Sequence, residues 1–371
     1  MIIVKEINTP QEFLQFVKFP FELYKNNAYW VPPLINDELK NFDKNKPIFK
    51  SVDVKYYLAY KDEKIAGRIA CIINQTEVKE LHKPKLRFGW FDVIDDVAVT
   101  QALIEKAVTM AKENQLQYIE GPMGFSNMDK AGMLTYGFDE IPTMIGLYNY
   151  EYYVTHLEQL GFQKEAEWLE FKLEMKNIRI EKIKPIADLI EKRYELRCLP
   201  FKSTKDIVPY VDEMFGLLNK SYANLQSFVP IQQFQIDHYK KKYIPFINPD
   251  FISCIVNKEG KMVAFAITMP SFSRAFQKAN GRLFPFGFIH LLKARKNNEY
   301  GEYYLIGVDP EYQSKGVTAI MFREIQIAMT KCGIKHMETN PLLEENSKVQ
   351  LLWKNFDPVV HKRRKTYKLN V

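Results

Sequence analysis

One segment of this chain places a strand, a glycine-containing loop and a helix in direct succession. An apolar, strand-like run at residues 303–308 leads into a turn at Asp309 and Pro310. The loop that follows contains Gly316 and opens onto an amphipathic run at residues 320–329. The first amides of a helix have no intrahelical acceptor, and the helix dipole favours negative charge beside them. Because a glycine also lets a ligand approach the main chain closely, the segment predicts a backbone cradle for a phosphate group.

At these residues the chain resembles the GNAT superfamily of acyl-CoA-dependent acyltransferases. The family's loop reads Gln or Arg, two residues, Gly, one residue, and Gly or Ala. Gln313 and Gly316 match this pattern, and Thr318 stands where the second small residue is expected. A later helix-like run begins at Asn346, as it does in the family, and Trp353 occupies the position of a tyrosine that often protonates the departing CoA thiolate. The resemblance therefore implies a CoA site that lacks one expected catalytic group.

The same order of predicted elements occurs twice along the chain. In each half a hairpin of β-prone strands is followed, after an insertion, by strand, helix, strand, helix and strand. These five elements occupy residues 88–93, 97–113, 117–120, 151–159 and 168–173 in the first half, and 302–308, 319–331, 335–339, 348–355 and 359–369 in the second. The resemblance implies two tandem GNAT-like domains, residues 1–176 and 177–371, each an α/β unit with a mixed, mainly antiparallel sheet flanked by helices.

The two halves differ where a CoA site would lie. In the first half Asp92, Asp95 and Asp96 precede the main helix without a glycine, and like charges at a helix N-terminus repel a pyrophosphate. We therefore expect the first domain to be degenerate and the second to carry the acyl-CoA loop. The first half instead has a Gly- and Pro-rich insertion at residues 121–142, and loops of that length tend to be functional.

The resemblance implies acetyl-CoA or another acyl-CoA as cosubstrate. In the family the strand before the loop pairs with pantetheine along a slot, and the loop holds the pyrophosphate. The candidate cofactor-binding residues are Ile306, Val308, Gln313, Ser314, Lys315, Gly316, Val317, Thr318, Ala319 and Asn346.

The acceptor side of such a reaction needs a general base or a water chain, because an attacking amine must lose a proton. Glu338 is the catalytic candidate, with a solvated strand carboxylate as the alternative interpretation. The candidate substrate-binding residues lie in two insertions and the late helix: Asn127, Arg274, Phe284, Phe286 and Trp353. The alternative for the aromatic insertion at residues 270–288 is that it only covers core surface.

Charge and cysteine content narrow the class of protein. The net charge of +7 is compatible with an anionic ligand such as CoA or with nucleic acid, and it decides little because no single basic block dominates. A nucleic-acid partner is not favoured. The basic run at residues 361–365 could contact CoA phosphates or form a basic edge strand. The four cysteines are isolated from one another, so no metal is expected. No apolar run approaches the ~20 residues that cross a bilayer, and we expect a cytoplasmic protein without membrane insertion.

These observations favour transfer of an acyl group, with acetyl preferred, from acyl-CoA to the amine of a small molecule or peptide. Two other functions stay open. One is a non-catalytic CoA- or ligand-binding protein of GNAT fold, which Thr318 and Trp353 would suit; the other is an aminoacyl-tRNA-dependent transferase. The acceptor, the acyl length and the oligomeric state do not follow from the sequence.

Overall fold

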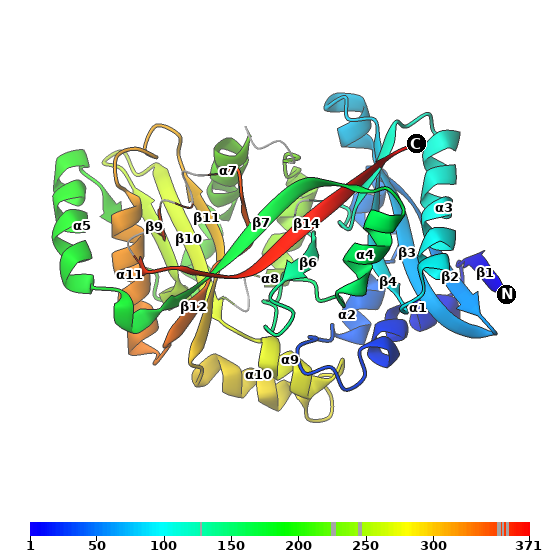
Figure 1. The fold of residues 1–371 in the computed structure, drawn as a ribbon. Coiled ribbons are helices and arrows are strands. Elements are labelled where there is room, and N and C mark those ends of the chain that lie inside the picture. The colour runs from blue at the N-terminus through cyan, green and yellow to red at the C-terminus, as the bar shows by residue number, and fades with distance from the viewer. Residues whose placement is uncertain (127, 224–227, 244–246, 347–349, 351, 354–355) are drawn as a thin grey trace.

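In the computed structural model, two lobes share one twisted sheet with helices on both faces (Figure 1). The structure describes residues 1–126, 128–223, 228–243, 247–346, 350, 352–353 and 356–371. Within this part of the chain, no helix is both long enough and apolar enough to span a bilayer.

The first half of the chain begins with β1 (Ile2–Glu6), α1 (Pro10–Leu23), α2 (Ile35–Lys40) and the short helix η1 (Pro47–Lys50). The hairpin of β2 (Val52–Lys61) and β3 (Lys64–Asn74) follows, then η2 (Thr76–Glu80), β4 (Lys85–Val93) and α3 (Val97–Glu113). The half ends with β5 (Tyr118–Gly121), β6 (Met133–Tyr136), α4 (Tyr152–Gln159) and β7 (Gln163–Glu174).

The second half begins with η3 (Met175–Asn177), α5 (Ile180–Tyr194), β8 (Arg197–Cys198), α6 (Thr204–Ile207), η4 (Val208–Tyr210), α7 (Val211–Tyr222) and α8 (Gln233–Tyr243). Next come η6 (Pro249–Phe251) and the hairpin of β9 (Ile252–Val256) and β10 (Met262–Pro270). An insert of α9 (Ser273–Ala279) and α10 (Gly287–Lys296) precedes β11 (Tyr300–Val308). The chain ends with α11 (Thr318–Lys331), β12 (His336–Glu338), β13 (Leu342–Leu343) and β14 (Val359–Asn370).

The described strands lie in the order β1-β2-β3-β4-β5-β14-β7-β12-β11-β10-β9-β8, with β6 beside β14 and β13 beside β7. Most neighbours are antiparallel, and β4–β5 and β11–β12 are parallel. Helix α3 covers one face of the first half of the sheet, and α11 covers one face of the second. The expected fold class, a mixed and mainly antiparallel sheet flanked by helices, is confirmed.

The last strand of each half lies in the other half's part of the sheet. β7 ends the first half but pairs with β12, and β14 ends the second half but pairs with β5. β7 and β14 also pair with each other, from Val359 opposite Lys172 to Lys368 opposite Gln163, and they cross the molecule side by side in Figure 1. We call β1 to β6 with β14 the first lobe, and β8 to β13 with β7 the second lobe. The division of the sequence at residue 176 stays a prediction, and the lobes exchange their last strands across it.

The basic run at residues 361–365 lies within β14. Because β14 has β5 and β7 as neighbours, the expectation of a basic edge strand is wrong. Lys362 and Arg364 are fully buried. Their charges need partners inside the protein, since an unpaired buried charge is very costly.

Those partners form a buried ionic row at the strand exchange. Lys362 Nζ lies 3.0 Å from Glu170 Oε2 of β7, and Arg364 also pairs with Glu170. Lys362 pairs in addition with Glu338 of β12. Burial alone would raise the pKa of Glu170, but Arg364 and Lys362 hold it well below its usual range. Arg364 also donates to the Leu147 carbonyl, so the row ties β7, β12 and β14 to the segment before α4.

Replacing Glu170 by Gln keeps the shape of the side chain and removes the charge that compensates Lys362 and Arg364. Breaking one partner of a buried pair costs about 3–5 kcal/mol. We expect Glu170→Gln to lower the free energy of unfolding by that amount in urea titrations at pH 7. Because the folded-state pKa is depressed, the difference from the wild type should shrink as the pH falls below the unfolded-state value of about 4.5.

The matched control is Glu165→Gln on the same strand. Its carboxylate lies 4.0 Å from Lys368 Nζ at a partly exposed site. Such a pair contributes at most about 1 kcal/mol. Equal losses of stability in the two variants would contradict a special role for Glu170.

Candidate functional site

β11 pairs with β12 over its first residues only, and it has a bulge on its other side, opposite β10. The two strands pair only through Tyr300–Glu302 and His336–Glu338. On the β10 side the register shifts after Ile267 and passes over Tyr304. A bulge bends a strand and ends its pairing. β12 ends at Glu338, whereas β11 continues to Val308, so the outer edge of β11 has no paired strand beyond Glu302 among the described residues, as a pantetheine slot requires.

Two main-chain carbonyl groups of β11 accept hydrogen bonds from α7. Tyr222 Oη lies 2.8 Å from the carbonyl oxygen of Ile306, and Ser221 Oγ lies 2.8 Å from that of Val308. Ile306 and Val308 are the residues predicted to pair with pantetheine. A carbonyl oxygen has two lone pairs, so a CoA amide could bind beside these hydroxyl groups or displace them.

The chain turns from β11 onto α11 at Gly316. Its φ angle of +74° is in the left-handed region that favours glycine. The amides of Gly316, Val317 and Thr318 have no acceptor among the described residues, and they point from the N-terminus of α11. This is the arrangement of amides that a phosphate cradle needs.

Helix α5 closes one side of this loop. A Cβ atom at Gly316 would lie 2.5 Å from Ile190 Cδ1. Lys315 Nζ lies 4.3 Å from the ring centre of Tyr312 and 5.5 Å from that of Tyr194. A side chain at position 316 would therefore have to move the Ile190 side chain and adopt a strained φ, and the Lys315 ammonium is held over aromatic rings.

Most of the predicted CoA-binding residues lie around this one turn. Gln313 and Ser314 are exposed, and Gln313 Nε2 lies 3.4 Å from the Val308 carbonyl oxygen. Ala319 is in the first turn of α11, whereas Asn346 lies after β13. The structure thus gathers the predicted set between the end of β11 and the start of α11, apart from Asn346, and the assignment of these residues to CoA stays a prediction.

Asp309 fixes the turn to α7. Its two carboxylate oxygens each lie 2.9 Å from Lys220 Nζ, and the amide of Glu311 donates to one of them over 3.0 Å. Burial opposes ionisation, but Lys220 lowers the pKa of Asp309. This ion pair keeps the start of the loop in one position.

Two carboxylates lie on adjacent strands where β11 and β12 still pair. Glu338, the predicted base, pairs with Lys362 and lies 3.3 Å from His361 Nε2. Glu302 is its neighbour in register on β11 and is 2% exposed. We did not select Glu302 from the sequence, although a single acid in the otherwise apolar run at residues 302–308 was an available signal.

Glu302 is buried without a hydrogen bond of normal geometry to either carboxylate oxygen within the described part of the chain. Burial raises the pKa of Glu302 to about 7, and Glu338 acts in the same direction. The Ser271 side chain, Lys362 and the Met144 main chain partly oppose this shift. A carboxylate that titrates near neutral pH can accept a proton from an amine, so Glu302 is a second candidate for the general base.

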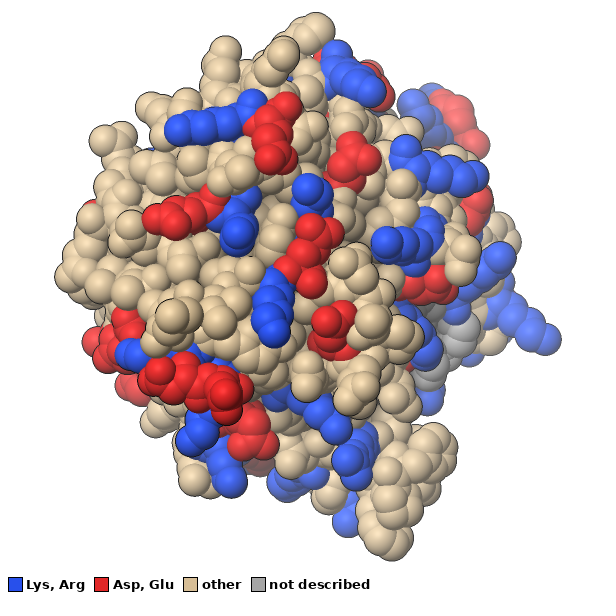
Figure 2. All heavy atoms as spheres, turned by 90° about the vertical axis from the view of Figure 1, so that its right-hand side faces the viewer, with Lys and Arg blue, Asp and Glu red and all other residues tan. Residues whose placement is uncertain are grey.

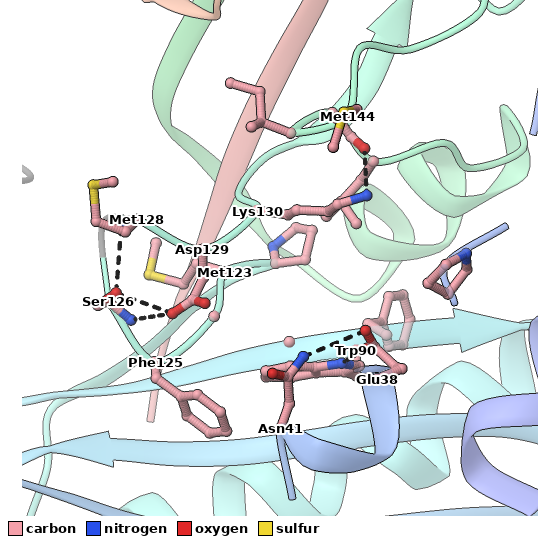
Figure 3. A pocket seen from close by; sticks show the side chains of 18 of the residues that line it. Glu38, Asn41, Trp90, Met123, Phe125, Ser126, Met128, Asp129, Lys130 and Met144 are labelled. Carbon is pink, nitrogen blue, oxygen red and sulfur yellow. Dashed lines mark hydrogen bonds between the residues drawn. The ribbon is translucent and has the colours of Figure 1, made fainter. Parts of the chain in front are cut away.

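A cavity of about 350 Å³ lies at the junction of the lobes. Figure 3 shows Glu38, Asn41 and Trp90 on one side of it, and Lys130 and Met144 on the other. The remaining first-lobe walls come mainly from residues 122–133 and 142–149, and Tyr239 and Tyr304 enter from the second lobe. Most of the lining side chains are aromatic or aliphatic, so the cavity suits an apolar molecule with a polar end.

A second, smaller cavity continues this space beneath α7. It measures about 50 Å³ and shares Met128, Tyr239 and Tyr304 with the larger one. Its other lining residues are almost all apolar: Val211, Met214, Phe215, Leu218, Lys240, Ile247, Phe265, Ile267 and Leu305. Tyr304, the residue of the bulge, therefore borders the divergent strands and both cavities.

The residues predicted for the acceptor are scattered. Asn127 lies outside the described residues. Arg274 is exposed and stacks 5.0 Å from the ring centre of Tyr300. Phe284 and Phe286 lie at the surface and do not line the cavity at the lobe junction. Trp353 is fully buried, with its ring centre 4.7 Å from that of Tyr303. Their roles in substrate binding stay predictions.

The three acids that precede α3 have separate partners. Asp92 pairs with Arg68 over 2.7 Å, and Asp95 lies 3.2 Å from His156 Nε2. Asp96 caps α3 by accepting a hydrogen bond of 2.9 Å from the amide of Ala98. The first lobe thus presents carboxylates where the second presents the glycine loop.

Comparison with known proteins gives similarity over the whole chain. No family model matches it. The chain is 24% identical over 376 residues to Protein YghO of Escherichia coli (strain K12), across 100% of this chain and 95% of that protein. It is 21% identical over 375 residues to Bacterial ceramide synthase of Caulobacter vibrioides (strain NA1000 / CB15N), across 97% and 95% of the two chains.

Solved structures share the fold at low sequence identity. A tandem GNAT protein from the clavulanic acid biosynthesis pathway superimposes with a TM-score of 0.59 and 9% identity, covering 100% of this chain and 98% of that one. A GCN5-related N-acetyltransferase from Sphaerobacter thermophilus superimposes with a TM-score of 0.53 and 8% identity, covering 100% of this chain and 95% of that one. The resemblance seen in the sequence is confirmed at the level of the fold, and the chain has the tandem GNAT fold with its two units joined by exchanged strands.

Proposed function

We propose that this protein transfers an acyl group from acyl-CoA to the amine of a lipid-like acceptor. The observation that carries the proposal is the meeting of three features at Tyr304: the divergence of β11 from β12, the cavity at the lobe junction, and the buried carboxylate of Glu302 two residues earlier. The tandem GNAT fold supports acyl transfer as the reaction class.

The donor would lie along β11. The free amides of Gly316, Val317 and Thr318 hold the pyrophosphate, and pantetheine follows the strand toward Tyr304. This direction places the thioester at the end of the slot that borders the cavity.

The chemistry requires one proton acceptor. The amine nitrogen attacks the thioester carbonyl carbon, a C–N bond forms, and the C–S bond breaks. Glu302 takes the proton that the nitrogen loses and later releases it to solvent, and the departing thiolate takes up a proton from water, so that the proton count balances. Glu302 suits this role because burial raises its pKa to about 7. The Glu338 carboxylate is instead engaged in an ion pair with Lys362.

The acceptor class rests on the cavity and on one relative. Ceramide is the N-acyl derivative of a long-chain amino alcohol, and a relative covering nearly the whole chain is named a bacterial ceramide synthase. The mostly apolar cavity, whose wall also holds both acidic and basic side chains, fits a polar head group that carries a hydrocarbon chain. The direct test is an assay of N-acylation with acyl-CoA and either a long-chain amino alcohol or a short amine of the same head group. Turnover of the long-chain amine alone supports the proposal, and CoA binding without turnover of either amine would favour a non-catalytic protein.

Glu302→Gln should lower kcat by about 10²-fold or more, with a smaller effect on KM, because it removes the base without changing its size. In the wild type kcat/KM should rise with pH through an apparent pKa of about 7, and this limb should disappear in the variant. Glu299→Gln, at an exposed site just before β11, is the control and should retain wild-type turnover. A larger loss of kcat in Glu338→Gln than in Glu302→Gln would indicate that Glu338 is the base.

The same variant has a readout in stability that does not involve catalysis. Glu302 binds its proton more tightly in the folded state than in the unfolded state, so wild-type stability falls as the pH rises from about 4.5 to about 7. The amide that replaces this carboxyl group in the variant does not titrate. We therefore expect Glu302→Gln to be more stable than the wild type by up to about 3 kcal/mol above pH 7, and nearly equal to it at pH 4.5. A stability difference that is the same at both pH values would contradict the raised pKa.

Ser314→Glu tests the phosphate cradle. Ser314 is exposed, so the substitution adds negative charge to the loop without the strained φ and the clash with the Ile190 side chain that a substitution at Gly316 would bring. We expect about a tenfold or greater loss of CoA affinity by calorimetry, because the new carboxylate opposes the field of the helix N-terminus. Ser314→Gln, of similar size and without charge, is the matched control. Equal affinities of the two variants would place CoA elsewhere.

A further inference from the structure

The α9–α10 insert presents apolar side chains to solvent. Phe284 is 76% exposed and Phe286 is 70% exposed, in the turn between the two helices. Phe288, Ile289 and Leu292 of α10 are also exposed. Residues 288, 289 and 292 follow helical spacing, so they form one stripe that continues the aromatic turn. An exposed apolar surface of this kind marks an interaction site.

The same insert accounts for almost all of the net charge of the protein. Residues 271–298 contain six of the 52 Lys and Arg residues and none of the 45 Asp and Glu residues, so the rest of the chain carries a net charge of only +1. The six cations are Arg274, Lys278, Arg282, Lys293, Arg295 and Lys296. All six are exposed, and within the described residues none forms an ion pair.

The face of the molecule seen in Figure 2 does not have this excess of positive charge. Figure 2 views the molecule from the side of α3 and β1, where acidic and basic side chains are intermingled. Charge on that face is compensated locally, for example by Lys61 and Asp96. The insert therefore combines an uncompensated positive charge with exposed aromatic side chains at one place.

The opposite side of the insert is anchored to the first lobe. Gln277 Nε2 donates to the carbonyl oxygens of Ala28 (2.9 Å) and Trp30 (3.1 Å), and Ser273 Oγ donates to that of Pro142 (2.7 Å). The amide of Ile35 donates to the Gly281 carbonyl over 3.0 Å. These contacts fix the insert at the lower edge of the molecule in Figure 1, while Phe284 and Phe286 of its turn stay exposed.

We propose that the α9–α10 insert docks this protein on the surface of an anionic lipid bilayer. Aromatic and aliphatic side chains enter the boundary between head groups and acyl chains, and Lys and Arg side chains extend to the phosphate groups. A bilayer accounts for both properties of the insert, because apolar burial and attraction to anionic lipid act together. Nothing in this docking spans the membrane.

The insert also lies beside the rim of the cavity at the lobe junction. Trp30, whose carbonyl oxygen binds Gln277, lines that cavity together with Val31 and Pro33. A docked insert would bring this rim close to the bilayer, from which a lipid-like amine could enter. The docking goes beyond the proposed function and does not depend on it, because vesicle binding is measured without acyl-CoA or amine.

Co-sedimentation of the full chain with vesicles tests the docking. The vesicles contain phosphatidylcholine alone, or phosphatidylcholine with about one third phosphatidylglycerol. We expect at least about tenfold tighter binding to the anionic vesicles, with a loss of affinity as salt is raised. The triple variant Phe284→Ser, Phe286→Ser and Leu292→Ser should weaken this binding about tenfold or more. The triple variant Lys293→Gln, Arg295→Gln and Lys296→Gln should remove most of the preference for anionic lipid.

The control replaces two apolar side chains that are exposed elsewhere. Ile186 and Leu189 of α5 are 53% and 63% exposed, and Asp188 and Glu191 lie on the same helix. Ile186→Ser with Leu189→Ser should bind vesicles as the wild type does. All substituted residues are exposed, so unchanged thermal unfolding is expected for each variant. Equal binding of the wild type and the Phe284 variant, or no preference for anionic vesicles, would overturn the proposal. A third outcome would also overturn it: the wild type is a dimer that does not bind vesicles, and the triple variant with Phe284→Ser is a monomer. The patch would then be the contact surface for a second copy of the chain.

Discussion

The pairing of Glu170 with Lys362 and Arg364 joins the two strands on which the rest of the structure depends. β7 and β14 each complete the sheet of the lobe to which they do not belong in sequence. Each lobe therefore depends on the other half of the chain for one strand of its sheet. The charges are buried where the strands cross, so only a register that pairs them is acceptable. Together with the β7–β14 ladder, this constraint holds the two lobes beside each other, and the cavity lies between them.

The candidate site follows from that junction. The segment before α4 is held by Arg364 through the Leu147 carbonyl, and it contributes one wall of the cavity. On the second-lobe side the pairing of β11 with β12 ends at Glu302, and β11 has a bulge at Tyr304 opposite β10. Glu302 is buried on the paired part of β11, close to Lys362 and Glu338 of the ionic row, and its neighbours raise or lower its affinity for a proton. The same arrangement of strands thus supplies the proposed donor slot, the acceptor cavity and the proton acceptor.

Local patterns in the sequence predicted local structure well. The helix expected at residues 97–113 has those bounds in α3, because its apolar spacing and its cap at Asp96 are both local signals. The glycine loop also leads onto a helix as expected, with Gly316 at positive φ. Described residues of the Gly- and Pro-rich insertion at residues 121–142 supply much of the cavity wall, and a functional role for this loop stays a prediction.

Features that depend on distant pairing were not predictable in this way. The run at residues 361–365 is strongly basic, and only its exchange into the sheet centre, opposite Glu170, makes burial of Lys362 and Arg364 acceptable. Glu302 could not be distinguished from an ordinary strand residue until β12 and the Met144 segment were in place around it. The positive charge of the insert was missed for a different reason. The net charge of +7 is a value for the whole chain, and it does not reveal that residues 271–298 contribute +6 of it.

The most direct measurement is a crystal structure of the protein with CoA and a long-chain amine bound. We expect the pyrophosphate at the amides of Gly316 to Thr318, the CoA sulfur beside Tyr304, and the amine nitrogen in the cavity within reach of Glu302. CoA bound in the first lobe near Asp95 and Asp96, or a sulfur atom that faces solvent with no connection to the cavity, would contradict a transfer site at the junction of the lobes.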